Sequence, residues 1–199
     1  MHISDGVLSG PVCAGTAVAA VAIAGAVLKK TEREDIPRIA VMTAAFFVAS
    51  LVHIKLGPAS VHLLLNGLVG IVLGWASFPA ILVALLFQAI MFQHGGITTL
   101  GANTLIMGVP ALVSWGMFRL KGKLPGYRFT PHVLSFTGGM VAILLSAAFM
   151  ALVLVFTGKE FIATAKLIMA AHLPLALVEG SITMLVVGFF MKVKPELVQ

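Results

Sequence analysis

Seven long apolar stretches, separated by short polar segments, constrain this chain more than any other feature. They cover residues 12–28, 39–54, 61–75, 80–92, 105–118, 133–156 and 168–191. About 20 mainly apolar residues allow a helix to cross the hydrocarbon core of a bilayer. The composition agrees, since 60% of the 199 residues are hydrophobic and 10% are charged. The sequence predicts an all-α, multi-pass integral membrane protein of about seven transmembrane helices, with residues 1–199 forming a single transmembrane domain. Pro174 is expected to kink or break the last helix.

The distribution of Lys and Arg predicts the orientation in the membrane. With the N-terminus outside, only Lys55, Lys159 and Lys166 lie outside, and the other ten of the 13 basic residues face the cytoplasm. Basic residues favour the cytoplasmic side, so this orientation is expected, and an odd number of helices then leaves the C-terminus in the cytoplasm. The ten are Lys29, Lys30, Arg33, Arg38, Arg119, Lys121, Lys123, Arg128, Lys192 and Lys194. The net charge of +6 is therefore explained by the membrane topology and does not indicate a nucleic-acid partner.

Several other classes of protein and processing are disfavoured by the sequence. A single cysteine, Cys13, excludes an internal disulfide and a multi-cysteine zinc site. A cleaved signal peptide is disfavoured, because residues 1–11 contain Asp5 and no Lys or Arg. The chain lacks the GxxxxGK signature of a phosphate-binding loop, a GxSxG elbow and an HExxH helix. We expect neither ATP hydrolysis nor enzyme activity from this chain.

The first two residues form a candidate metal chelate. A histidine at position 2 lets the α-amine of Met1, the deprotonated backbone nitrogen of His2 and His2 Nδ1 close a five- and a six-membered ring around one ion. Three nitrogens in one plane, with a fourth from elsewhere, suit the tetragonal geometry of Ni(II) or Cu(II). An early histidine also occurs by chance, so this pattern needs support from the rest of the chain.

A second candidate region follows Gly57 and Pro58, which break the chain on the exterior side. His62 is expected at the exterior end of the third helix, with Asn66 four residues later on the same helix face. Gly67, Gly70 and Gly74 would let neighbouring backbones approach closely. The alternative is an interfacial histidine beside an asparagine that bonds another helix.

A third region, residues 92–104, is polar and glycine-rich between two apolar stretches. Irregular backbone at membrane depth is tolerated only where protein buries it or where it lines a cavity. We expect a structured loop over the bundle. Its side chains could hydrogen-bond the metal-binding groups, with Asp5 balancing charge or holding the turn of the N-terminal segment. The loop candidates are Gln93, His94, Thr98, Thr99 and Asn103.

Together, MHISDG at residues 1–6, SVHL at residues 60–63 and HGGITTLGANT at residues 94–104 resemble the CbiM/NikM family. These are substrate-binding S components of energy-coupling-factor (ECF) transporters for cobalt and nickel. The resemblance covers about the first 120 residues strongly and the remainder through hydrophobic pattern. The family usually has Pro or Met at its fourth position, where this chain has Ser4.

The resemblance implies a ligand set, partners and a location. The metal ligands would be the Met1 amine, the amide and imidazole nitrogens of His2, and His62. Ni(II) would be the favoured substrate and Co(II) its competitor, with no permanent cofactor. Transport would need a transmembrane coupling subunit (T component), two ATP-binding subunits and, in some systems, a small accessory membrane subunit, all in the prokaryotic plasma membrane. The surface that docks the coupling subunit would be formed by Ala40, Ala44, Ala45 and Ala49, with helix one (Ala20 and Ala24) as an alternative.

Two other functions are compatible with the histidines. A haem-carrying membrane subunit could use a pair among His53, His62, His94 and His172 as axial ligands. A proton-coupled metal carrier could use His172 and Glu179, because ionisable groups within a membrane are functional candidates.

Overall fold

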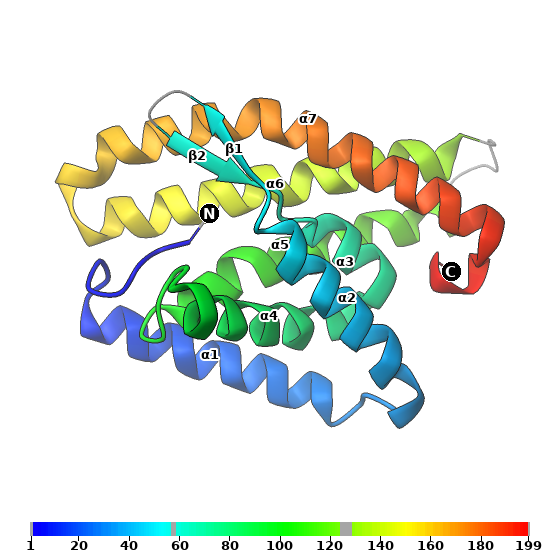
Figure 1. The fold of residues 1–199 in the computed structure, drawn as a ribbon, viewed down its shortest axis with the longest axis horizontal. Coiled ribbons are helices and arrows are strands. Elements are labelled where there is room, and N and C mark those ends of the chain that lie inside the picture. The colour runs from blue at the N-terminus through cyan, green and yellow to red at the C-terminus, as the bar shows by residue number, and fades with distance from the viewer. Residues whose placement is uncertain (1, 57–58, 124–128, 199) are drawn as a thin grey trace.

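The protein is a helical bundle with one small hairpin, shown in Figure 1. The computed structural model describes residues 2–56, 59–123 and 129–198, and of residues 53–56 and 59–61 the backbone alone. Within these residues the α-helices are α1 (Gly10–Leu28), α2 (Ile36–Ala49), α3 (Asn66–Leu73), α4 (Ser77–Phe92), α5 (Leu100–Arg119), α6 (Thr130–Thr157) and α7 (Ile162–Val193). Short 3-10 turns occupy Arg33–Asp35, Gly74–Ala76, Leu120–Gly122, Lys159–Phe161 and Pro195–Val198.

Five helical stretches of the described chain are long and apolar enough to cross a membrane: Gly10–Leu28, Asn66–Phe92, Leu100–Gly122, Thr130–Thr157 and Lys159–Val193. The α3 helix has 8 residues, and at 1.5 Å per residue it is about 12 Å long. It therefore cannot cross the hydrocarbon core alone. The protein is a multi-pass helical membrane protein, and the number of crossings and the sides of the termini stay predictions.

The hairpin corrects two predicted helix ends. Strands β1 (His53–Leu56) and β2 (Ala59–His62) pair antiparallel, with His53 opposite His62. The second helix was expected to continue to residue 54 and the third to begin at residue 61, but they end and begin at Ala49 and Asn66. The hairpin pairs the facing backbone groups of its two strands, and non-helical backbone of this kind is tolerated at membrane depth only where protein buries it or where it lines a cavity.

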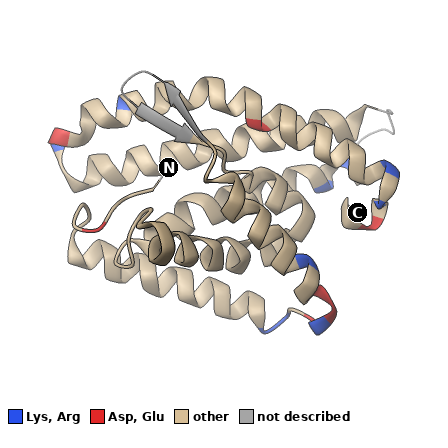
Figure 2. Ribbon diagram, viewed as in Figure 1, with Lys and Arg blue, Asp and Glu red and all other residues tan. Residues whose placement is uncertain are grey.

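The last helix excludes one of the two effects expected of Pro174, a break, whereas a kink stays a prediction. The α7 helix is continuous over Ile162–Val193, with Pro174 inside it, so the proline does not break it. It packs antiparallel to α6, and the hairpin crosses this pair, with β2 in contact with α7 (Figure 1). Lys and Arg gather mainly at the end near the C-terminus (Figure 2). This is the end that the sequence places in the cytoplasm; Arg128 lies outside the described residues.

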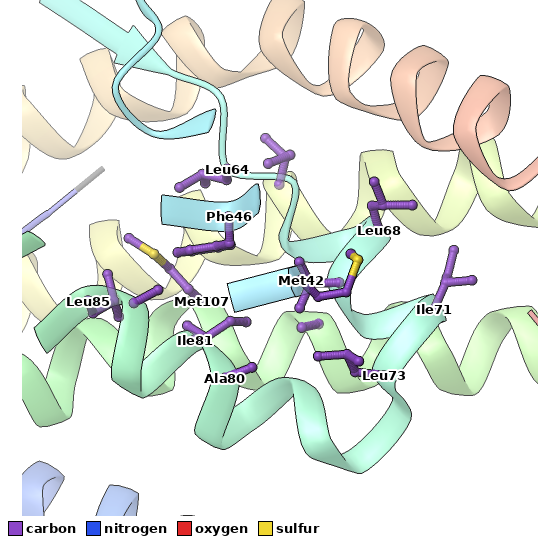
Figure 3. Close-up of a cluster of buried hydrophobic side chains, with 14 of the residues drawn as sticks. Met42, Phe46, Leu64, Leu68, Ile71, Leu73, Ala80, Ile81, Leu85 and Met107 are labelled. Carbon is purple, nitrogen blue, oxygen red and sulfur yellow. The ribbon is translucent and has the colours of Figure 1, made fainter. Parts of the chain in front are cut away.

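The hydrophobic core lies between α2, α3, α4 and α5, as Figure 3 shows. Met42, Phe46, Ile81 and Met107 fill it, and Leu64 closes the end nearest the hairpin. The α3 and α5 backbones approach so closely that a Cβ on Gly70 would lie 2.0 Å from the carbonyl oxygen of Ala111. The close approach expected of the third-helix glycines is confirmed at this position. The segment after His62 therefore leads into a helix that is packed tightly against α5.

Candidate metal centre

The N-terminal segment, residues 2–8, runs from the start of α1 into the bundle and ends beside β2 (Figure 1). Ile3 anchors it, with 2% of its surface exposed. The Asn103 side-chain amide accepts from the Ile3 backbone N–H at 2.9 Å and donates to the Ile3 carbonyl at 3.0 Å. The Thr99 hydroxyl donates to the same carbonyl at 2.7 Å. These two side chains, from the glycine-rich loop and from α5, thus bond the backbone groups that an extended segment would otherwise pair with a neighbouring strand.

Asp5 forms a second anchor at the surface. Its carboxylate accepts from the Thr98 backbone N–H at 3.0 Å and from the Thr98 hydroxyl at 2.5 Å. The hydroxyl bond is the main reason that the pKa of Asp5 lies below its ordinary value. A Cβ on Gly96 would lie 1.9 Å from the Asp5 carboxylate. Glycine is needed there because the loop lies directly against the N-terminal segment.

The His2 imidazole is held by a chain of hydrogen bonds that starts within the bundle. Its Nε2 lies 2.8 Å from Gln88 Oε1. The Gln88 amide nitrogen donates to Ser50 Oγ at 2.7 Å, and the Ser50 hydroxyl donates to the Phe47 carbonyl at 2.7 Å. Because Gln88 presents its acceptor oxygen to the ring, Nε2 carries the proton. The lone pair of His2 then lies on Nδ1, which is the nitrogen that the chelate needs.

Neither Gln88 nor Ser50 was among the predicted site residues. Both side chains are completely buried. One signal was present in the sequence: Gln88 is a polar side chain inside the apolar stretch 80–92, and a polar group within a membrane requires a partner.

His62 is the residue that lies against His2. It ends β2, with 5% of its surface exposed, and the two imidazole rings stack with centroids 4.9 Å apart and planes 22° apart. His62 Nδ1 lies 3.1 Å from the carbonyl oxygen of Leu63. Two residues separated by 60 positions are thus brought together at the N-terminal segment, and their role as metal ligands stays a prediction. Met1 lies outside the described residues.

The two neighbouring loop residues lie differently. His94 lies near the site, with its ring 6.0 Å from that of His2, whereas Gln93 is exposed and follows α4 in a left-handed conformation.

Asn66 does not share a helix face with His62, because His62 precedes α3 and Asn66 begins it. The Asn66 amide instead donates to the Met107 carbonyl at 3.2 Å and to Ser146 Oγ at 2.9 Å. It joins helices, which was the alternative interpretation of this residue.

The two intramembrane ionisable residues do not bond each other. The imidazole Nδ1 of His172 lies 2.7 Å from the carbonyl oxygen of Ile168. The Glu179 carboxylate accepts hydrogen bonds from the backbone N–H groups of Leu64 and Leu65. No group of three His, Cys, Asp or Glu side chains able to hold a metal occurs in the described part of the chain.

Comparison with solved structures places this architecture among metal transporters. The chain superimposes on the crystal structure of a transition metal transporter with a TM-score of 0.77 and 29% sequence identity, covering 97% of this chain and 93% of the other. The fold is that of a multi-pass membrane component of transition-metal transport.

Sequence comparison then gives the family. A family model described as the cobalt uptake substrate-specific transmembrane region (CbiM) matches residues 2–197, and the chain belongs to this family. A putative metal transport protein of Haemophilus influenzae is 37% identical over 198 residues, 98% of this chain and 96% of the relative. A fused nickel transport protein, NikMN, of Rhodobacter capsulatus is 41% identical over 115 residues, 55% of this chain and 33% of the relative. The chain is therefore a transmembrane component of cobalt or nickel transport.

Proposed function

We propose that this protein is the substrate-binding S component of an ECF-type transporter that captures Ni(II) from outside the cell. The ligands are the Met1 amine, the backbone and imidazole nitrogens of His2, and His62. The substrate enters a site closed by the N-terminal segment and the loop of residues 94–99. The protein resides in the prokaryotic plasma membrane.

The observation that carries this proposal is the hydrogen bond between His2 Nε2 and Gln88 Oε1. The chelate requires an unprotonated Nδ1 on that ring, and the Gln88 oxygen at 2.8 Å holds the proton on Nε2 instead. A histidine packed only for its apolar surface does not need a buried amide whose own orientation is set by Ser50. Metal-binding histidines usually donate their second nitrogen to such a partner.

Nickel is preferred over cobalt because of the donor type. Four nitrogen donors in one plane suit Ni(II) in its tetragonal geometry, and Ni(II) exceeds Co(II) in general affinity for a nitrogen site. Co(II) is expected to bind more weakly at the same place.

Titration of the detergent-purified protein with Ni(II) tests the proposal, comparing the native N-terminus with a form extended by one glycine before Met1. The extension moves the α-amine away from His2 and leaves every side chain in place. Tight binding by the native form alone is the expected result. Equal binding by both forms would show that the N-terminal chelate is not the binding site. Absence of Ni(II) and Co(II) binding by the native form would overturn the proposed function.

Uphill transport requires a T component and two ATP-binding subunits, because this chain carries no phosphate-binding loop. We propose that α2 docks the T component. Ala40 and Ala44 line an apolar groove of about 440 Å³ between α2 and α4, together with Phe47 and Phe87. Ala45 is also exposed and Ala49 is partly buried. The alternative surface on α1 is disfavoured, because Ala20 and Ala24 are buried against Phe78.

Substitution of Ala44 by Trp would fill this groove. It should abolish co-purification with the T component while leaving Ni(II) binding by the isolated protein unchanged. The matched control is Val18→Trp on α1, where the side chain is 71% exposed. If co-purification survives Ala44→Trp and fails with Val18→Trp, the docking surface lies on α1 and not on α2.

A further inference from the structure

Residues 63–65, here called the link, connect His62 to the first turn of α3 by irregular backbone. Leu65 has a φ of 53°, in the left-handed region that a branched side chain seldom adopts. Leu64 is completely buried. The backbone N–H groups of Leu64 and Leu65 precede α3 and have no partner within that helix. In a membrane protein such groups need a partner from elsewhere in the bundle.

The partner is a single carboxylate from α7. Glu179 is 1% exposed. Its Oε1 accepts from the Leu64 N–H, and the Leu65 N–H lies 3.2 Å from Oε1 and 3.0 Å from Oε2. One side chain, more than 110 residues away in the sequence, thus fixes two successive peptide groups of the link.

One of these peptide groups also contacts the His62 ring. The Leu63 carbonyl lies 3.1 Å from His62 Nδ1, and the same planar peptide group carries the Leu64 N–H that Glu179 accepts. A carbonyl oxygen can only accept, so Nδ1 of His62 carries the proton and the lone pair lies on Nε2. A hydrogen-bond acceptor on the N–H side of a peptide group polarises the carbonyl on its other side and strengthens the bond that this carbonyl accepts.

We propose that Glu179 is a positioning residue for the metal site, setting the ring orientation and the tautomer of His62 through the Leu63–Leu64 peptide group. This inference rests on the proposed function, in which His62 is a metal ligand. The hydrogen bonds of Glu179 within the described residues go to the Leu64 and Leu65 N–H groups and not to the His62 ring. The proposal therefore requires that its effect on metal affinity passes through His62.

A purely structural role for Glu179 makes a different prediction. If Glu179 only satisfied the N–H groups that precede α3, its replacement would weaken the fold and lower metal binding whether or not His62 were present. A double-mutant cycle separates the two roles, because residues that act through each other are not additive.

The experiment measures Ni(II) affinity for the full chain with a native N-terminus, in detergent, for Glu179→Gln and Glu179→Leu, each with His62 and with His62→Ala. Glutamine keeps the shape and one acceptor oxygen, and leucine removes both acceptors. With His62 present, Glu179→Leu should lower affinity about 10–100-fold, the usual effect of losing an outer partner of a metal ligand, and Glu179→Gln should lower it less. With His62→Ala, each change should alter affinity less than about 2-fold, because a residue that acts through His62 has no effect once His62 is absent. Effects that were independent of His62 would instead be equal in the two backgrounds.

The matched control is Thr183→Val, one turn further along α7. Thr183 is completely buried, and its hydroxyl makes no hydrogen bond within the described residues. It should leave Ni(II) affinity unchanged in both backgrounds. Equal losses in the two backgrounds for the Glu179 variants would overturn the proposal and assign Glu179 a structural role.

A second measurement tests the tautomer without metal. In ¹⁵N-histidine-labelled apo-protein at a pH where the imidazoles are neutral, His62 should carry its proton on Nδ1, and Glu179→Leu should shift it toward a mixture of tautomers. Glu179→Gln keeps the proposal testable if the leucine variant does not fold. Protonation of His62 on Nε2 in the unsubstituted protein would refute the proposal. Absence of metal binding together with an Nδ1 proton on His62 would instead refute only the proposed function.

Discussion

The two histidines of the site are held in contrasting ways. His2 lies on a segment anchored by side chains of neighbouring elements, and a buried glutamine bonds its ring directly. His62 ends a hairpin strand above the packed core, and its ring contacts a peptide group that α7 holds from the other side. The N-terminal segment offers three of the proposed donors and the hairpin one. Both rings are thus oriented by partners inside the protein, one directly by a side chain and the other indirectly through a peptide group.

The largest expected effect comes from replacing each histidine in turn. His2→Gln removes the chelating imidazole and should lower Ni(II) affinity far more than His62→Gln, which leaves all three N-terminal donors. Glutamine is chosen because a small second residue would lead to removal of Met1. Titration calorimetry measures both variants, and a larger loss for His62→Gln would reverse the order of importance.

The next effect concerns the chain of hydrogen bonds to His2. Gln88→Leu removes the acceptor that keeps the proton on Nε2, so Ni(II) affinity should fall about 10–100-fold. Ser50→Ala removes only the partner that orients the Gln88 amide, and should cost less. Ni(II) binding that is insensitive to Gln88→Leu would show that the His2 tautomer is set by something else.

A smaller effect is expected at the anchor of Ile3. Asn103→Ala removes two hydrogen bonds to the N-terminal segment, each contributing about 0.5–1.5 kcal/mol. The loss of both bonds corresponds to a decrease of roughly 5–150-fold in the population of the ordered segment. The bond from Thr99 to the Ile3 carbonyl remains and reduces this decrease. Exchange of the Ile3 amide proton with deuterium should accelerate in parallel with the loss of Ni(II) affinity.

The smallest effect is expected at Asp5, which is exposed. Asp5→Asn should change Ni(II) affinity only a few-fold, since exposed polar contacts contribute little. The pKa of Asp5 is lowered, so its anchoring is complete above the ordinary value of about 3.9 and is lost only as the pH falls through the lowered pKa.

Binding should nevertheless weaken as the pH falls from about 8 to about 5, because the amine, the amide and the imidazoles must lose protons. Asp5→Asn should leave that pH profile unchanged. A profile that moves with Asp5→Asn would contradict this assignment.

Much of the site could be predicted, because its residues occur in three compact polar segments within an apolar chain. The ends of the apolar stretches placed His62 at the membrane level of the N-terminus, and the family resemblance implied its pairing with His2. The geometry around His62 could not be predicted so well. The sequence HIKL at residues 53–56 and ASVH at residues 59–62 fits a hairpin as well as a helix end, and short apolar segments do not distinguish the two.

The partners that orient the rings were harder to recognise. Gln88 and Glu179 are isolated polar residues on otherwise apolar helices, and nothing in the local pattern says which distant segment each one meets. Glu179 was considered with His172 because seven residues separate them on one helix face. Its actual partners are backbone groups, which leave no trace in a sequence.

The anchoring of Ile3 has a consequence for the lifetime of the bound ion. In the proposed chelate the donor nitrogens of residues 1 and 2 are joined to Ile3, which Asn103 and Thr99 hold in place. Release of the ion would then be coupled to the opening of these hydrogen bonds, a first-order step whose rate does not depend on the metal concentration. A slow, concentration-independent release would keep scarce metal on the protein between successive turnovers of the transporter.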